Sequence, residues 1–314
     1  MMTEILLDSL MPIFVVMALG YLAGWTRDID NHHLAALNAL VMDFALPLSL
    51  FVATASTPRA LLLAQWPLLV VLAVSMLVLY ALSYWAQRRW FGLGSSEASV
   101  QTLTTAVPNY AGGLPLFAAV FGPTDTIFVA LALATASIVL SPLTLAILEF
   151  NNAAANGQQN FGVVLQAISR SLRKPIVLGP VAGVLFALLG IPLVEPVSRS
   201  FQLIGQSAGG VALFLTGLIL SSQRVELSLN VSGGMLVKNI VHPLLAVGLI
   251  LVLPIDRDTA RAAVLLCALP SGFFGVLFGL RYGLESHVAG ATLIATSIAS
   301  ILTLPAVLVL TGGW

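Results

Sequence analysis

The sequence predicts an all-α membrane protein with ten transmembrane helices in two inverted five-helix repeats, in which the fourth and ninth helices are broken and cross each other. Three observations lead to this prediction: an apolar composition, ten apolar segments of spanning length, and prolines and glycines that interrupt two of them. Of the 314 residues, 59% are hydrophobic and 8% are charged. A soluble domain carries about a quarter charged residues, so lipid is the solvent that this composition fits.

The apolar segments follow one another with short connections that hold most of the charge. A spanning helix needs about 20 mostly apolar residues. Ten segments approach this length: 5–25, 33–54, 62–85, 98–120, 125–148, 173–190, 197–221, 232–253, 260–281 and 287–311. The N-terminal stretch contains Glu4 and Asp8 but no Lys or Arg. This is atypical of a signal peptide, so the first segment is expected to remain as a span.

The longest polar connection divides the chain into a first repeat at 1–150, a cytoplasmic linker at 151–162 and a second repeat at 163–314. Equivalent segments of the two halves share patterns: Pro12 and Pro175 are each followed by a glycine eight residues later. The fifth and tenth segments share Ala-Thr, then Ser-Ile, then a late proline. Five spans per half is an odd number, so the second half must be inverted relative to the first.

Positive charge in the short connections predicts the orientation. Even-numbered connections hold four basic residues, Arg59, Arg199, Arg257 and Arg261. Odd-numbered connections hold eight: Arg27, Arg88, Arg89, Arg170, Arg173, Lys174, Arg224 and Arg281. The odd connections are therefore expected to be cytoplasmic, and both termini periplasmic or extracellular. With 13 basic and 13 acidic residues, the chain shows no charge excess that would indicate a nucleic-acid partner.

Two segments are interrupted in their interior. Pro108 in the fourth segment has no N–H and frees the carbonyl of Thr104, and Pro270 in the ninth frees that of Leu266. Non-helical backbone survives at membrane depth only when it is buried in protein or lines a wet cavity. The half-helices that follow begin with unpaired N–H groups and a positive dipole end, which suit a carboxylate. Ordinary proline kinks, which are common in spans, are the alternative.

We expect the two interruptions to face each other near the midplane and to hold the anionic end of a substrate between them. The Asn109 amide can donate two hydrogen bonds, Ser271 can donate a third, and Tyr110 offers a ring wall and a hydroxyl. Glycines allow a ligand to approach the backbone. The expected substrate-binding residues are Pro108, Asn109, Tyr110, Gly112, Gly113, Pro270, Ser271 and Gly272.

Three ionisable residues lie within predicted spans: Asp43, Lys238 and His242. A charge at mid-span costs about 2.5–3.5 kcal/mol on the mildest scale and usually faces a partner or a cavity. Asp43 lies four residues before Pro47, so its carboxylate and freed carbonyl form a candidate station for a coupling ion, H⁺ or Na⁺. A structural carboxylate, a snorkelling lysine and a structural histidine are the alternatives. No metal-ligand spacing is found, and no cofactor is expected.

Four motifs spread over the chain are LNALVMDFALPLSLF (37–51), VPNYAGGLPLF (107–117), VKNIVHPLLA (237–246) and CALPSGFFGVLFG (267–279). They resemble the auxin efflux carrier family, in the bacterial branch that includes malonate-type transporters. The resemblance implies two inverted five-helix repeats, crossing of the fourth and ninth helices at prolines, and elevator-like movement of an organic anion. Plant members carry Asn-Pro-Asn and a following Tyr at the fourth-span crossover. Here Val107 replaces the first Asn, a departure that concerns the substrate rather than the architecture.

The predicted function is therefore secondary transport of a small mono- or dicarboxylate, malonate-like, across a bacterial inner membrane by an elevator-type mechanism. A channel or a membrane sensor on the same fold is the first alternative, although no soluble output domain is evident. An intramembrane enzyme is the second, but it would need a nucleophile with a base or paired deep aspartates. The expected partners are the carboxylate and the bilayer. The pairs Gly20/Gly24 and Gly179/Gly183 favour close packing inside the chain, with a homodimer contact as their alternative use.

Overall fold

The computed structural model describes residues 2–29, 34–122, 127–155, 161–222, 226–284 and 287–312. These residues form helices joined by turns, and their only β-type contact is an isolated bridge between Pro108 and Ser271. The all-α prediction is confirmed for the described part of the chain. Residues 156–160 of the predicted linker, Arg224 and residues 313–314 lie outside it.

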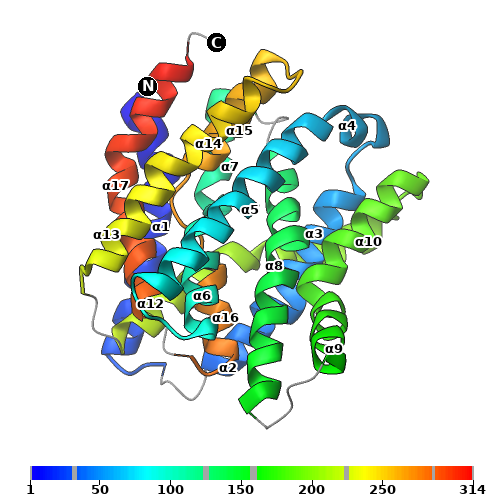
Figure 1. Cartoon of the computed structure of the whole chain (residues 1–314). Coiled ribbons are helices and arrows are strands. Elements are labelled where there is room, and N and C mark those ends of the chain that lie inside the picture. The colour runs from blue at the N-terminus through cyan, green and yellow to red at the C-terminus, as the bar shows by residue number, and fades with distance from the viewer. Residues whose placement is uncertain are drawn as a thin grey trace.

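The helices follow the predicted segments closely (Figure 1). The first half contains α1 (Met2–Trp25), α2 (Leu34–Ala39), the π-helix η2 (Leu40–Ala45), α3 (Leu46–Ala55), α4 (Arg59–Ala64), α5 (Trp66–Arg89), α6 (Ser95–Ala106), α7 (Tyr110–Val120) and α8 (Ile127–Ala155). The second half contains α9 (Phe161–Leu172), α10 (Pro175–Leu189), α11 (Glu195–Gly205), α12 (Ser207–Ser221), α13 (Leu229–Leu236), the π-helix η3 (Val237–Val241), α14 (His242–Ile250), α15 (Arg257–Ala268), α16 (Phe274–Arg281) and α17 (His287–Thr311).

Six helical stretches are long and apolar enough to cross a membrane: Leu34–Ala55, Trp66–Arg89, Ile127–Ala154, Glu195–Ser221, Leu229–Ile250 and His287–Thr311. A seventh candidate is the pair formed by Gly162–Leu172 and Pro175–Leu189, which is bent by 62°. The protein is therefore multi-pass. The segments predicted at 98–120 and 260–281 are each divided into two shorter helices, α6 and α7, and α15 and α16.

The connection between the two halves differs from the prediction. α8 continues to Ala155, and α9 occupies residues that were expected to be linker and loop. Val163, Ala167 and Ser171 recur every four residues on α9 and are buried, whereas Leu165 and Ile168 remain exposed. A helix of 12 residues with Arg170 in its last turn is too short to be recognised as a span by itself.

Two spans contain a π-helical turn immediately before a proline, at Pro47 and at Pro243. The N–H groups of Leu46 and His242 bond carbonyls five residues earlier, those of Val41 and Val237. Because a proline cannot donate to the carbonyl four residues back, the hydrogen-bond ladder shifts its register there. The two π-helices contain Asp43 and Lys238.

Helices pack into two groups. In the first, α1 lies along α12 and α10 lies along α3, which also contacts α11. Gly20 and Gly217 face the backbones of α12 and α1, and Gly179 and Gly183 face α3. We call α1, α2–α3, α10 and α11–α12 the glycine-packed group. In the second, α5–α8 and α13–α17 pack around the break between α6 and α7 and the break between α15 and α16, and we call these helices the crossing group.

Candidate functional site

The two proline interruptions meet each other inside the protein. Pro108 lies between α6 and α7, and Pro270 lies between α15 and α16. The Asn109 N–H donates to the Pro270 carbonyl at 2.7 Å, and the Gly272 N–H donates to the Val107 carbonyl at 2.7 Å. Backbone groups of each break are thus satisfied by the other break, as burial at membrane depth requires.

The breaks approach too closely for larger side chains. A Cβ on Gly272 would lie 2.8 Å from the Pro108 carbonyl oxygen, and a Cβ on Gly275 would collide with Thr104 and with the carbonyl of Val100. Contact at this distance needs residues without side chains. The glycines of 267–279 therefore place α16 directly against α6.

A cavity of about 720 Å³ lies beside the crossing, between the two helix groups. α3 and the α11–α12 junction contribute one side, and α7, α8 and the start of α16 contribute the other. None of the described residues that line it is charged. Its polar side chains are Ser49, Tyr110, Gln202 and Gln206.

Three of the predicted binding residues, Pro108, Tyr110 and Gly272, line this cavity. Asn109 and Ser271 are fully buried in the crossing, behind its wall. The remaining three, Gly112, Gly113 and Pro270, belong to α7 and to the break before α16 and do not line the cavity either.

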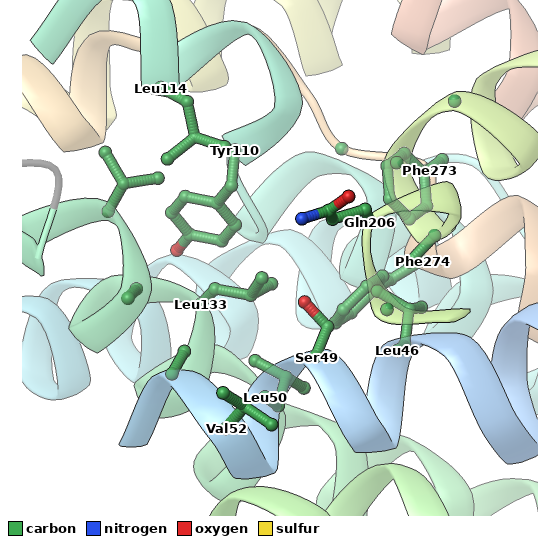
Figure 2. A pocket seen from close by; sticks show the side chains of 18 of the residues that line it. Leu46, Ser49, Leu50, Val52, Tyr110, Leu114, Leu133, Gln206, Phe273 and Phe274 are labelled. Carbon is green, nitrogen blue, oxygen red and sulfur yellow. The ribbon is translucent and has the colours of Figure 1, made fainter. Parts of the chain in front are cut away.

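Sequence reasoning missed the residues on the opposite wall. Figure 2 shows the side chains of Ser49 and Gln206 projecting into the space that Tyr110 borders. Gln206 stands between α11 and α12, and Ser49 lies on α3. The one signal in the sequence was the pair of amides, Gln202 and Gln206, within an apolar segment predicted to span.

A buried polar cluster involves Lys238 and His242, which are both 0% exposed. The Lys238 Nζ lies 2.7 Å from the His242 Nδ1 and donates to the Cys267 carbonyl at 3.1 Å. Cys267 is in the last turn of α15, just before the break, so the amine lies at the negative end of that helix dipole. The snorkelling alternative for Lys238 is wrong, because the side chain points into the protein.

Asp43 and Glu149 form ion pairs that join the two groups of helices. Asp43 accepts from Arg281 at 2.6 Å, linking η2 to α16. Glu149 on α8 lies 3.1 Å from the Lys174 Nζ at the start of α10, and accepts from the Tyr282 hydroxyl at 2.7 Å. Arg281 and Glu149 border one pocket of about 470 Å³. The Asp43 carboxylate, the expected station for a coupling ion, thus has the Arg281 guanidinium as its partner in this structure.

A multi-pass helical protein with two helix pairs, α6–α7 and α15–α16, broken at a common crossing, and an uncharged cavity between two helix groups, has features in common with membrane transporters. Comparison with known proteins agrees with this class. The family described as "Membrane transport protein" matches residues 5–308, and the chain belongs to this family, which includes the auxin efflux carriers. It is a transporter family rather than an enzyme family.

Three relatives in this family match the chain over more than nine-tenths of its length. The chain is 26% identical over 308 residues to "Uncharacterized transporter YfdV" of Escherichia coli K12, covering 97% of both chains. It is 28% identical over 313 residues to "Putative malonate transporter" of Rhizobium meliloti, covering 96% of this chain and 94% of that one. It is 24% identical over 330 residues to "Auxin efflux carrier component 5" of Arabidopsis thaliana, covering 94% and 93%.

Proposed function

We propose that the protein is a secondary transporter that moves a small carboxylate across a bacterial inner membrane by an elevator-type mechanism. The observation that carries the proposal is the cavity, which is bordered by the crossing and lies between the two groups of helices. The similarity to "Putative malonate transporter" supports an organic anion as the substrate.

Helix packing supports the ten-span arrangement in two inverted repeats, 1–150 and 163–314. In such repeats α1 corresponds to α10, and α2–α3 corresponds to α11–α12. The contact of α1 with α12 is then equivalent to the contact of α10 with α3, and both are packed through glycines. The start of α1 and the end of α17 lie at one end of the molecule (Figure 1), as an even number of spans requires. The charge count predicts that this end faces the periplasm.

An elevator-type movement would slide the crossing group against the glycine-packed group. The hydrogen bonds between the two breaks lie within the crossing group, so this group can move without losing them. The ion pairs Asp43–Arg281 and Glu149–Lys174 connect the two groups and would have to open. We therefore assign to Asp43 a role in holding one conformation closed.

We assign the coupling of transport to an ion to Lys238 and His242, with the proton as that ion. No carboxylate of the described residues lies within salt-bridge distance of Lys238. A buried charge without a counter-charge is costly, so the Lys238–His242 pair is poised to lose or gain a proton when its surroundings change. The Lys238 amine also donates a hydrogen bond to the Cys267 carbonyl at the end of α15. A sodium ion bound there would need that oxygen as a ligand.

Uptake into proteoliposomes tests the proposed function. Purified protein is reconstituted, and a panel of radiolabelled mono- and dicarboxylates is offered under imposed pH, sodium and voltage gradients. We expect saturable uptake of at least one carboxylate, driven by the pH gradient and indifferent to sodium. Flux that rises without saturation would indicate a channel, and binding without flux would indicate a sensor.

The crossing residues Asn109 and Ser271 stay within the proposed site. Each follows a proline, and each lies next to a residue that lines the cavity, Pro108 and Gly272 respectively. We propose that they shape the backbone of the crossing, and that Tyr110 makes direct contact with the substrate.

A further inference from the structure

We infer that α9 lies at the membrane surface and that its basic end binds the phosphate of an anionic phospholipid through Arg170, Arg173 and Lys174. This site is separate from the cavity beside the crossing, which no residue of α9 lines. The consequence for transport, that the bound lipid loosens the ion pair between Glu149 and Lys174, rests on the proposed function.

One apolar face of α9 is left uncovered by the protein. Leu165, Ile168 and Leu172 recur at helical spacing, and each is between 43% and 54% exposed. α9 packs along the end of α8 (Figure 1) and buries a different face, which includes Ala167 and Ser171. A row of exposed apolar side chains on one helix face, with basic residues beside it, is typical of a helix that lies on a membrane.

This row continues into a spanning surface, which identifies lipid as its neighbour. α9 and α10 together form a candidate span, and α10 also carries exposed leucines, Leu178 and Leu185. α10 has 15 residues. Such a helix is about 22 Å long, which is shorter than a hydrocarbon core of about 30 Å. α10 is therefore too short to cross alone, and the apolar face of α9 completes the lipid-facing surface up to the headgroups.

Three basic residues follow the apolar face, and one carboxylate partly balances them. Arg170 and Lys174 lie 3.9 and 3.1 Å from oxygens of Glu149. No carboxylate of the described residues lies within salt-bridge distance of Arg173. The Arg170 side chain is 53% exposed, whereas that of Glu149 is 11% exposed. Exposed positive charge therefore remains, and it attracts anionic lipids, whose phosphate oxygens fit the donors of a guanidinium group.

A bound phosphate would compete with Glu149 for Lys174. Lys174 precedes α10 of the glycine-packed group, and Glu149 belongs to α8 of the crossing group, so their ion pair joins the two groups. The Tyr282 hydroxyl donates to Glu149 as well, so the carboxylate keeps a donor when Lys174 leaves. The lipid thereby makes the ion pair easier to open and speeds the movement of the two groups.

Lipid binding tests the site on the purified, full-length protein. Phosphatidylglycerol and phosphatidylcholine with identical acyl chains are added in detergent, and dissociation constants are measured by native mass spectrometry. We expect phosphatidylglycerol to bind about tenfold more tightly. Glycerol 3-phosphate, which has the phosphate without the chains, should not displace it at equal concentration. Displacement would indicate a site for a soluble anion and would overturn the assignment to lipid.

Charge variants test which residues bind the phosphate. Arg170→Gln with Arg173→Gln should bring phosphatidylglycerol binding to within about twofold of phosphatidylcholine binding. Arg199→Gln with Arg257→Gln is the matched control, because it removes the same charge from connections predicted to lie on the opposite side of the membrane. Equal loss in both double variants would assign the preference to net charge and overturn the site. Arg173→Gln alone gives a second reading if the first double variant does not purify as a folded protein.

Fluorescence quenching tests whether the apolar face of α9 meets lipid. Leu165→Cys and the neighbouring Gln166→Cys are labelled with a fluorophore in vesicles, and the native Cys267 is buried and stays unlabelled. The label at position 165 should be quenched by nitroxide-bearing lipid, and the label at position 166 by acrylamide in the water. Equal quenching of both labels by acrylamide would show that this face meets water and would overturn the inference.

Uptake measurements separate the lipid site from the proposed function. Wild-type carboxylate uptake should be about threefold or more faster in vesicles that contain phosphatidylglycerol than in phosphatidylcholine alone. Glu149→Gln should be as fast in phosphatidylcholine as the wild type is with phosphatidylglycerol. A rate that does not respond to bound phosphatidylglycerol would overturn the effect on the ion pair. Failure of every carboxylate in both lipids would overturn the proposed function, while binding and quenching would still decide the lipid site.

Discussion

Replacing Gly272 by alanine tests whether the two breaks are packed as closely as the structure shows. The added Cβ would lie 2.8 Å from the Pro108 carbonyl oxygen and 3.0 Å from that of Val107. Both neighbours are backbone atoms, so the two breaks must separate. Separation removes two buried backbone hydrogen bonds of 2.7 Å, those donated by Gly272 and Asn109. Leaving a buried group unsatisfied costs about 1–3 kcal/mol, so we expect a loss of about 2–6 kcal/mol in stability.

The assay is thermal unfolding in detergent together with carboxylate uptake into proteoliposomes. Gly248→Ala is the matched control, because Gly248 lies within α14 and a Cβ there would meet nothing within 4 Å. Alanine favours a helix interior over glycine by about 1 kcal/mol, so the control should be as stable as the wild type or more so. If Gly272→Ala unfolds at the wild-type temperature and transports at the wild-type rate, the crossing is looser than the described geometry.

Three further predictions concern charged residues. Asp43→Arg and Arg281→Asp should each impair transport as single variants, and the double variant, which exchanges the two partners of the ion pair, should restore it. Two impaired single variants without rescue in the double variant would contradict the gating role of the pair. Lys238→Met should retain carboxylate binding but lose acceleration of uptake by a pH gradient, whereas unchanged acceleration would exclude Lys238 from coupling. Asp256→Ala should lower stability by about 1 kcal/mol, since the Asp256 side chain accepts from the Thr259 N–H at the start of α15. Burial opposes ionisation of Asp256, but hydrogen bonds from Thr259 outweigh it and lower the pKa of the carboxyl. The stability that depends on this ionisation is therefore present above about pH 4 and is lost as the pH falls further through the folded pKa. A loss of stability in Asp256→Ala that is equally large at pH 7 and at pH 3 would contradict this.

Much of the fold follows from local rules that a sequence displays. A chain in lipid must satisfy its backbone within each segment, so apolar length predicts where long helices lie. Six long apolar helical stretches and one bent helix pair of the described residues fall at seven of the ten predicted segments. Pro108 and Pro270 cannot donate an N–H, so the breaks at those positions were predictable from single residues. α9 was missed because a helix of 12 residues is too short to be recognised as a span by itself.

Only part of the candidate site could be predicted from the sequence, because side-chain direction is set by packing between segments that are far apart in the chain. Asn109 and Tyr110 are adjacent in sequence, yet Asn109 is locked into the crossing while Tyr110 reaches the cavity. Gln206 belongs to no motif, and it becomes a candidate only because the α11–α12 junction packs against α3 and shares the cavity with α7. Its position depends on how those helices dock.

The sequence by itself determined that this chain is a helical, multi-pass membrane protein in which two apolar segments are broken at prolines, because composition and proline chemistry act locally. Only the tertiary structure decided which groups the charged side chains bind. It pairs Asp43 with Arg281, 238 residues away, and gives the Lys238 amine to a carbonyl at the end of α15. Such choices depend on which helix faces meet, and glycine contacts that let backbones touch, such as Gly275 of α16 against α6, set those faces.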